Sequence, residues 1–562
     1  MRINHSRRDG PMSTRTWSGL AAAALLSLAA VGCTDPMVAP KSTVTTANIF
    51  TDKAAYQQFL AKIYAGLIVT GQRGPDGNAD IGGIDEGFGE YLRLYWYLQE
   101  VPTDEALIGW NDPGLPDLNT GLWGADNSMV NAMYYRVFYQ VMLVNEFLRQ
   151  TVDDSLAARG QSDIKDQVHQ YRAEARFLRA LSYAHGLDLF GDIPLVTETD
   201  PLGATPPKQV ARDSIFKYVV SELNDIKGSL PAVGPSAYGR ATESAANMLL
   251  AELYLNAGVY TGTDHWADAL AAAQTVIGSG SFSLSPSFHS NFTADNNLSP
   301  ELIYVAPQDG NHTQTWGGMT FLVHAGCGGS MLASWFGMDY CWGGYRMTQQ
   351  AYRLFGTGDS RGAFIYDSLT AVDSTTARRQ RDSLATSDTT KWTKIDKTRS
   401  DSAGSVGSFD QGPANPKFTN MTSTGGRGAQ LGMVDTDFPI FRLGEAYLIY
   451  AEAAVRSGTN RAQALTYVNL LRERAYGGAA GDITDPQLTL DFLLSERGRE
   501  LLFEAKRRTD LIRYGLFQSG TYVWAWKGGV AGGTALTAGR DLYPIPANEL
   551  IANPNLKQNP GY

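Results

Sequence analysis

Apolar residues in many segments of this chain recur at the spacing of an α-helix that buries one face. Between 130 and 148, for example, apolar side chains occupy positions i, i+3, i+4 and i+7. The same period is found over 52–69, 163–188, 210–228, 242–257, 264–278, 444–457, 461–475 and 490–501. Because each such helix must cover its apolar stripe with neighbouring elements, the pattern predicts a mainly α protein built from packed helices.

Three of these segments carry small residues ahead of a glycine. Ala446 and Ala451 precede Gly458, and similar alanine pairs precede Gly186 and Gly258. Small residues let a neighbouring helix approach closely, and the glycine supplies a left-handed residue that ends the helix. In two cases another predicted helix follows at once, so the sequence predicts a tetratricopeptide-like array of helix pairs.

The helical period is absent from 70–128 and 281–436, where Gly, Ser, Thr, Asn and aromatic residues are frequent. Connections of that length in a compact protein usually carry function. We therefore predict a helical scaffold over about 47–69, 129–280 and 437–515. The two long regions between its parts are predicted to be irregular loops.

The first residues have the pattern of an export signal, with basic residues before an apolar run over 20–31 and then Gly32 and Cys33. Lipoprotein signal peptidase cleaves between a small residue and a Cys at this place. We therefore predict a signal peptide over 1–32 and a lipid on Cys33. Ala30 stands where such signals usually have Leu, so an ordinary secretory signal with an incidental Cys is the alternative.

The chain beyond the lipid site predicts a tether and one domain. Residues 33–46 are rich in Thr, Pro and small residues and suit a flexible tether, and 47–562 is predicted to be a single domain. No later segment offers the ~20 apolar residues that a membrane helix needs, which leaves the lipid as the membrane anchor. Met12 is an alternative start, since 12–33 alone makes a compact signal peptide.

Charge and motif content exclude several classes of function. The formal net charge is −10, whereas a nucleic-acid interface needs clustered positive charge. The seven His residues are scattered without metal-ligand spacing, and no Gly-x-Ser-x-Gly motif is present. The sequence therefore predicts neither a cofactor nor a catalytic metal.

Acidic residues in 70–128 could belong to a glycosidase site or to a calcium-binding loop. A glycosidase needs two carboxylates that flank a sugar, and acidic residues are present here without any further sign of a hydrolase. Asp76 to Asp80 begins like an EF-hand calcium loop, but Ile81 and Gly87 replace its glycine and its closing glutamate. A polar turn is favoured, and a structural calcium ion is left unassigned.

Several dense motifs follow one another in a characteristic order. Near the C-terminus they are DFPIFRLGEAYLIYAEA over 437–453, ERGRELLFE over 496–504, KRR over 506–508, DLIR over 510–513, YPIP over 543–546, NPNL over 553–556 and QNPGY over 558–562. In the N-terminal half they are AEARFLRA over 173–180 and LFGDIPL over 189–195. With these motifs the chain resembles the SusD/RagB family of outer-membrane nutrient-binding lipoproteins.

The resemblance implies a fold and a function. The fold would be about four tetratricopeptide-like helix pairs, with irregular loops and a few short strands forming the ligand face. The function would be the capture of a glycan at the outside of the outer membrane, without catalysis, and its delivery to a SusC-like TonB-dependent barrel transporter. A peptide-binding lipoprotein of the same family is the alternative, followed by a secreted hydrolase on a helical scaffold. The motif over 496–504 and the arginines Arg176 and Arg179 are interpreted as structural, because their charges suit bridges between helices.

Aromatic residues in the two loop regions are the candidate ligand contacts, since a sugar ring presents an apolar C–H face that packs on an indole. Those loops carry Trp110, Trp123, Trp316, Trp335, Phe336, Tyr340, Trp342 and Tyr345. For each ring, anchoring of a loop is the alternative role. In the family the ligand lies on an aromatic platform from these parts of the chain, so the resemblance singles out Trp110, Asn111, Asp112, Trp335, Trp342, Tyr345 and Arg346.

Cys327 and Cys341 are the remaining thiols once Cys33 is lipidated. An exported protein folds in an oxidising compartment, where two cysteines in one loop region tend to pair. We predict a disulfide between them, and two buried free thiols are the alternative.

Overall fold

A computed structural model describes residues 49–75, 79–203, 205–329, 331–363, 406–409 and 411–562. The chain divides into two compact units, Met1–Asp52 and Lys53–Tyr562, and the fold described below is that of the second unit. The predicted signal peptide over 1–32, Cys33 and the tether over 33–46 lie outside the described residues. The division into a tether and one domain over 47–562 therefore stays a prediction.

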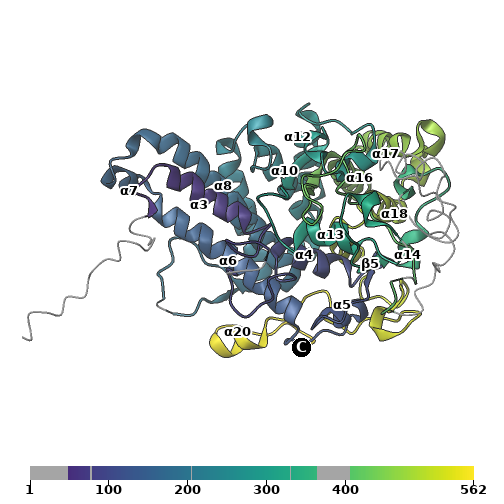
Figure 1. The fold of residues 1–562 in the computed structure, drawn as a ribbon, viewed down its shortest axis with the longest axis horizontal. Coiled ribbons are helices and arrows are strands. Elements are labelled where there is room, and N and C mark those ends of the chain that lie inside the picture. Colours follow the sequence, from purple (N-terminus) through teal and green to yellow (C-terminus); the bar gives the residue numbers. More distant parts are fainter. Residues whose placement is uncertain (1–48, 76–78, 204, 330, 364–405, 410) are drawn as a thin grey trace, which may run out of the picture. The chain divides into compact units, whose positions relative to one another are not determined.

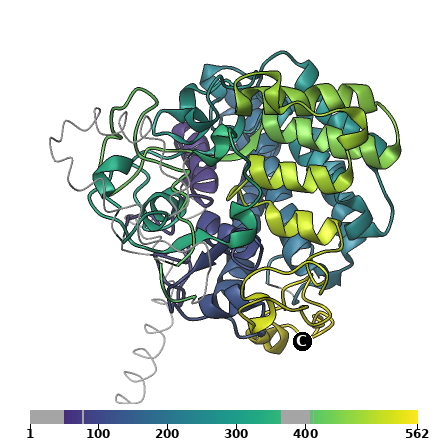
Figure 2. The same cartoon turned by 90° about the vertical axis from the view of Figure 1, so that its right-hand side faces the viewer.

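The second unit is built mainly from helices, which confirms the predicted fold class. Its scaffold helices are α3 (Ala54–Ala65), α6 (Ser128–Gln150), α8 (Lys165–Phe190), α9 (Arg212–Ile226), α10 (Glu243–Leu255), α12 (Trp266–Gly278), α16 (Leu443–Ser457), α17 (Arg461–Tyr476) and α18 (Leu490–Glu500). Consecutive members pack side by side, as α6 with α8, α8 with α9, α10 with α12 and α16 with α17 (Figures 1 and 2). All nine correspond to segments with the apolar helical period.

The three glycines that were expected to end helices have different roles. Gly458 ends α16 in the left-handed conformation, at φ 69°, as predicted. Gly186 and Gly258 do not, because Gly186 lies inside α8 and Gly258 lies inside the short α11 (Ala257–Thr261). A Cβ on Gly186 would come within 2.8 Å of Cδ1 of Ile193, so this glycine allows a close approach of the chain.

The described residues form three two-stranded antiparallel sheets, two of which connect segments that are distant in sequence. β1 (Ala106–Ile108) pairs with β5 (Tyr345–Met347), β2 (Ile193–Pro194) with β3 (Gln209–Val210), and β4 (Leu302–Ala306) with β6 (Phe438–Arg442). In the first sheet Leu107 lies opposite Arg346. This sheet joins the two regions that were predicted to be loops.

Those two regions also contain helices that the sequence pattern missed. They are α4 (Tyr91–Glu100), α5 (Leu115–Thr120), α13 (Gly318–Ala325) and α14 (Gln349–Tyr352). All eight residues of α13 are buried, and nine of the ten in α4 are buried as well. Each of these helices is shorter than the window of about 11–18 residues in which an apolar period can be recognised, so the sequence pattern did not reveal them.

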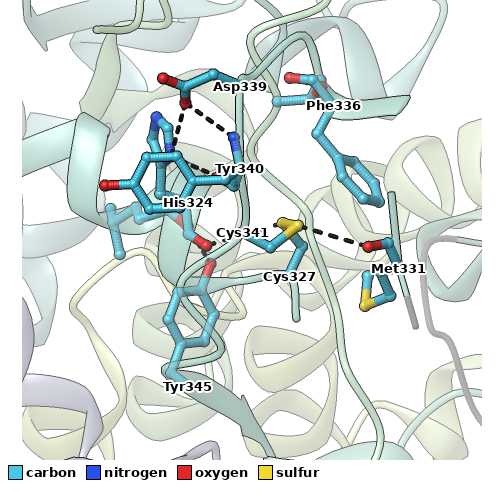
Figure 3. The surroundings of a disulfide bond; sticks show 10 residues. His324, Cys327, Met331, Phe336, Asp339, Tyr340, Cys341 and Tyr345 are labelled. Atoms are coloured by element: carbon cyan, nitrogen blue, oxygen red, sulfur yellow. Dashed lines mark hydrogen bonds and ion pairs between the residues drawn. A yellow bond between two sulfur atoms is a disulfide. The ribbon is translucent and has the colours of Figure 1, made fainter. Parts of the chain in front are cut away.

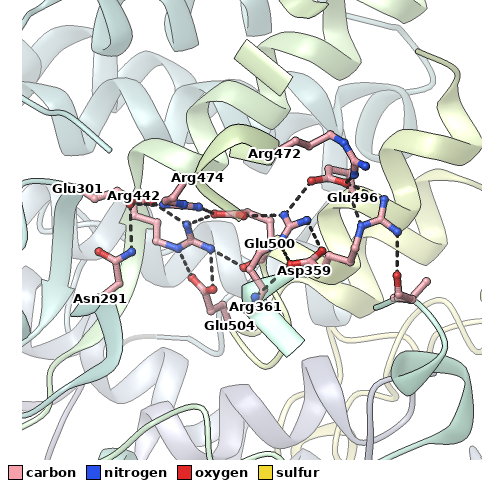
Figure 4. A network of polar contacts seen from close by, with 12 residues as sticks. Asn291, Glu301, Asp359, Arg361, Arg442, Arg472, Arg474, Glu496, Glu500 and Glu504 are labelled. Carbon is pink, nitrogen blue, oxygen red and sulfur yellow. Dashed lines mark hydrogen bonds and ion pairs between the residues drawn. The ribbon is translucent and has the colours of Figure 1, made fainter. Parts of the chain in front are cut away.

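A buried ionic network ties β6 to the segment over 496–504 (Figure 4). Arg442 contacts Glu301, Glu500 and Glu504 at 2.7–2.8 Å. Arg361 contacts Glu496 and Glu500 at 2.8 and 3.0 Å. Arginine has five donors in a fixed fork, so each guanidinium can join several carboxylates at once. The structural interpretation of this motif is confirmed.

Arg176 and Arg179 on α8 both contact Glu222 on α9, at 2.6 and 2.9 Å, and so bridge helices as predicted. Within the described part of the chain, no helix combines the length and apolar character required to cross a membrane.

Candidate functional site

The antiparallel pairing of β1 with β5 brings the segment that follows β1 close to the segment that precedes β5. Gly109 donates its N–H to the carbonyl of Gly344 at 3.3 Å, just beyond the last strand pair. Trp110 follows directly and lies over Gly344, where a Cβ would stand 2.7 Å from Cζ2 of the indole. Glycine at 344 is therefore required for Trp110 to lie against the segment that carries Trp342.

Four rings gather here, and we call them the aromatic cluster: Trp110, Trp316, Tyr340 and Trp342. Trp342 is central, with ring centroids 6.4 Å from Trp110, 6.1 Å from Trp316 and 6.4 Å from Tyr340. Tyr340 is 55% exposed, and the three tryptophans are half-buried. Rings of this kind are packed against the protein on one part of their surface and are open to solvent on another.

Arg93 on α4 contacts two residues of the aromatic cluster. Its guanidinium carbon lies 4.4 Å from the ring centroid of Phe321 on α13 and 5.7 Å from that of Trp110. Its Nη1 donates to the carbonyl oxygen of Trp316 at 2.9 Å. Arg93 is almost fully buried. Through cation–π contacts and a hydrogen bond it connects Trp110 and Trp316 to helices α4 and α13. Sequence reasoning missed Arg93 because α4 itself was not predicted.

The loop that carries Tyr340 and Trp342 is built on the carboxyl end of α13. Trp342 and Gly343 donate their backbone N–H groups to the carbonyls of His324 and Cys327, at 2.9 and 2.8 Å. A disulfide joins Cys327 to Cys341, with the two Cα atoms 5.2 Å apart (Figure 3). The cluster's central ring therefore stands on a segment with both covalent and hydrogen-bonded support.

Polar groups flank the rings. Asn111 is exposed and Asp112 is half-buried, and both directly follow Trp110. Asp339 precedes Tyr340, accepts the N–H of Tyr340 at 2.8 Å and is 45% exposed. Amide and carboxylate oxygens beside exposed aromatic faces match a ligand with apolar C–H faces and a rim of hydroxyl groups.

Three predicted contact residues are buried, and the prediction that they touch a ligand is corrected. Trp335 is 2% exposed, and Tyr345 and Arg346 are completely covered. Tyr345 donates its hydroxyl to the carbonyl of Leu322 at 2.8 Å, and Arg346 donates Nη2 to the carbonyl of Val406 at 2.9 Å. Consecutive side chains of a strand point to opposite faces, and both faces of β5 are covered, so Tyr345 and Arg346 support the site from within.

Two other loop aromatics, Trp123 and Phe336, are also buried and act as loop anchors. Trp316 and Tyr340, which were not among the chosen contacts, complete the cluster instead. Sequence alone did not separate anchors from exposed rings, because both lie beside the same polar and glycine residues.

Three other acidic residues of 70–128 have partners of their own. Asp80 contacts Lys62 at 2.6 Å, and Asp104 is buried against Arg507 at 2.7 Å. Asp85 accepts backbone N–H groups of its own loop, and Asp76 lies outside the described residues. Across the residues that the structure describes, no group of three or more His, Cys, Asp or Glu side chains is arranged to hold a metal ion.

Comparison with known proteins shows relatives over most of the chain. A sequence model described as the SusD family matches residues 277–562. The starch-binding protein SusD of Bacteroides thetaiotaomicron is 32% identical over 529 residues, covering 90% of this chain and 92% of that protein. SusD-like protein P2 of Formosa agariphila is 26% identical, covering 96% of this chain and 98% of that protein.

Solved structures share the fold. Surface glycan-binding protein A from Bacteroides thetaiotaomicron, in complex with laminarihexaose, has a TM-score of 0.67 at 20% identity, covering 90% of this chain and 98% of that one. Surface glycan-binding protein A from Bacteroides fluxus has a TM-score of 0.66 at 21% identity, covering 91% of this chain and 100% of that one.

Proposed function

This chain belongs to the SusD family, and from that premise we propose that it binds a glycan on the aromatic cluster without altering it chemically. The observation that carries the proposal is the group of three half-buried indoles and one exposed phenol around Trp342. Each ring offers a flat apolar face to the C–H side of a sugar. Asn111, Asp112 and Asp339 supply hydrogen-bonding partners for hydroxyl groups.

The relatives support a carbohydrate as the ligand. One is named a starch-binding protein, and another was solved in complex with laminarihexaose. A peptide remains the alternative ligand, since aromatic rings and carboxylates also suit peptide side chains. A hydrolase is disfavoured because the similar proteins are named as binding proteins.

We extend the proposal to location and partner. Gly32 and Cys33 at the end of the apolar run favour a lipid-anchored protein of the outer membrane that faces the cell exterior. Family membership favours a SusC-like TonB-dependent barrel transporter as the receiver of the glycan. Gentle detergent extraction and affinity purification from the native host is expected to recover such a barrel. Repeated isolation of the lipoprotein alone would count against this partner.

The binding proposal is tested with purified protein and a panel of glycans and peptides that includes soluble starch and laminarihexaose. Replacing Trp110 and Trp342 together by Ala is expected to weaken glycan binding at least tenfold, because a stacked ring typically contributes ~1–3 kcal/mol. The matched control is Trp266→Ala, since Trp266 is also half-buried but lies on α12 against Arg456.

Four outcomes separate the alternatives. Glycan binding that the double variant loses and Trp266→Ala keeps supports the proposal. Binding of peptides alone would favour the peptide alternative, and shortened glycan products after incubation would favour the hydrolase. Unchanged glycan affinity in the double variant would place the site away from the aromatic cluster.

A further inference from the structure

The orientation of Trp342 does not come from a hydrogen bond of its own. Its Nε1 is buried, and the described residues provide no hydrogen-bond partner for it. The neighbouring rings of Trp110, Trp316 and Tyr340 are all tilted against it, by 45°, 59° and 47°. None of these three tilted rings is stacked on the face of Trp342.

His324 lies beneath that face. It stands in the last turn of α13, its side chain is completely buried, and its ring is stacked on Trp342 with centroids 4.7 Å apart and an interplanar angle of 27°. Such a near-parallel contact covers one side of the indole with a planar surface. A ligand that stacks on Trp342 therefore meets the opposite side.

The imidazole itself is held in one orientation. Its Nδ1 lies 2.8 Å from the carbonyl oxygen of Tyr340 (Figure 3). A carbonyl accepts only, so Nδ1 carries the proton and donates it. Burial lowers the pKa of His324, which keeps the ring neutral with Nε2 as the unprotonated nitrogen. The carboxylate of Asp339, 3.9 Å from Nδ1, is the charged group in contact with it.

The same residue also fixes the backbone of the loop. The carbonyl of His324 accepts the N–H of Trp342 at 2.9 Å. His324 therefore contacts the loop on both sides of Cys341, through its ring at Tyr340 and through its carbonyl at Trp342. Together with the stack, these contacts set both the position of Trp342 and the plane of its indole.

We propose that His324 is a positioning residue of the glycan site, whose ring, anchored on Tyr340, forms the surface on which Trp342 is held in its binding orientation. This inference rests on the proposed function. His324 does not touch the ligand, because its side chain is completely covered. It acts on affinity through Trp342, by removing the need to order that indole when the ligand binds.

Two side-chain replacements separate the ring from its hydrogen bond. His324→Asn keeps a donor near the position of Nδ1 but removes the ring. His324→Phe keeps a planar ring and removes the donor. If His324→Asn does not fold, His324→Leu takes its place, because Leu fills the apolar space without providing a planar surface.

The readout is the 19F resonance of Trp342 in protein labelled with 5-fluorotryptophan, measured without ligand. The chain has 11 tryptophans, and Trp342→Phe assigns the resonance. Affinity is measured in parallel with laminarihexaose and soluble starch. We expect His324→Asn to shift or broaden the Trp342 resonance and to weaken binding roughly two- to tenfold, the range of an aromatic pair. His324→Phe is expected to lie between wild type and His324→Asn in both measurements, because it keeps the planar surface and loses only the anchor on Tyr340.

An unchanged Trp342 resonance in His324→Asn would overturn the inference. Equal loss of glycan affinity in the Asn and Phe variants would overturn it as well. Trp342→Ala shows separately whether the site itself is correct. If Trp342→Ala leaves affinity unchanged, the proposed glycan site fails, and the resonance alone then decides whether His324 positions Trp342.

Discussion

Nη1 of Arg442 lies 2.7 Å from Oε1 of Glu500, and both side chains are buried (Figure 4). Arg442 ends strand β6, whereas Glu500 ends helix α18, so this contact joins two parts of the chain that are 58 residues apart. Burying charges costs several kcal/mol per ion, and their mutual attraction offsets this only while every partner is present. Removal of any one member of the network therefore leaves a buried charge without a partner and destabilises the folded state.

Arg442→Met is expected to lower the free energy of unfolding by about 3–5 kcal/mol, because it leaves buried carboxylates without a partner. Urea denaturation at neutral pH measures the change. The matched control is Arg461→Met, since Arg461 pairs with Asp485 at 3.0 Å on the surface, with the two side chains 33% and 56% exposed. That variant should cost less than ~1 kcal/mol. Equal losses in the two variants would contradict the prediction.

The stability of the protein should decline as the pH rises above about 4.5. Burial raises the pKa of Glu445, which lies on α16 at 3.2 Å from Lys506. The folded state then keeps a proton that the unfolded state releases near its ordinary pKa of about 4.3. The free energy of unfolding therefore falls, by up to about 1.4 kcal/mol per pH unit, until the pH passes the raised pKa.

Glu445→Gln cannot release that proton, so its unfolding free energy should depend less on pH between about 4.5 and 8. Urea denaturation of both proteins across this range provides the comparison. Glu496 acts in the opposite direction, because its arginine partners outweigh burial and hold its pKa at about 2. The stabilisation from ionised Glu496 is fully present above about pH 4.5 and is lost as the pH falls toward 2. Parallel pH profiles for wild type and Glu445→Gln would refute the assignment.

Removal of the disulfide by replacing Cys327 and Cys341 with Ser should lower stability by ~3 kcal/mol, as expected for a closed loop of this length. The two cysteines are 14 residues apart, and the loop between them carries Tyr340. Ligand affinity should fall as well, because Trp342 follows the bridge directly. Intact mass after alkylation under denaturing conditions tests the bridge in the native protein. Two thiols alkylated without reductant would show that the cysteines are free.

Cys33→Ala should release the protein from membranes. The reason is that Cys33 is the predicted lipid site and that a multiply acylated N-terminus anchors firmly, whereas a single chain binds only marginally. Fractionation of cells that express wild type or variant gives the measurement, with Arg461→Met as the control because that change lies on the surface of the folded unit. Equal membrane retention of Cys33→Ala and wild type would exclude the lipid anchor.

The helical scaffold was predictable because its helices are long enough to repeat an apolar period over several turns. They have from 11 residues in α18 to 26 in α8. In α6, for example, the repeated positions Val130, Val137, Val141 and Val144 are all buried. Helix α13 has only eight residues, all of them buried, which is too short for such a repeat to be recognised.

The sequence by itself determined the helical scaffold, the family and the two regions that carry the candidate site. Local spacing and ordered motifs are properties of the chain alone, so they need no knowledge of distant contacts. Only the tertiary structure decided that Trp110 and Trp342 belong to a half-buried cluster while Trp335 and Tyr345 are fully covered. The direction of each ring depends on the pairing of β1 with β5, which joins residues more than 200 positions apart, and on the contacts of the loop with α13.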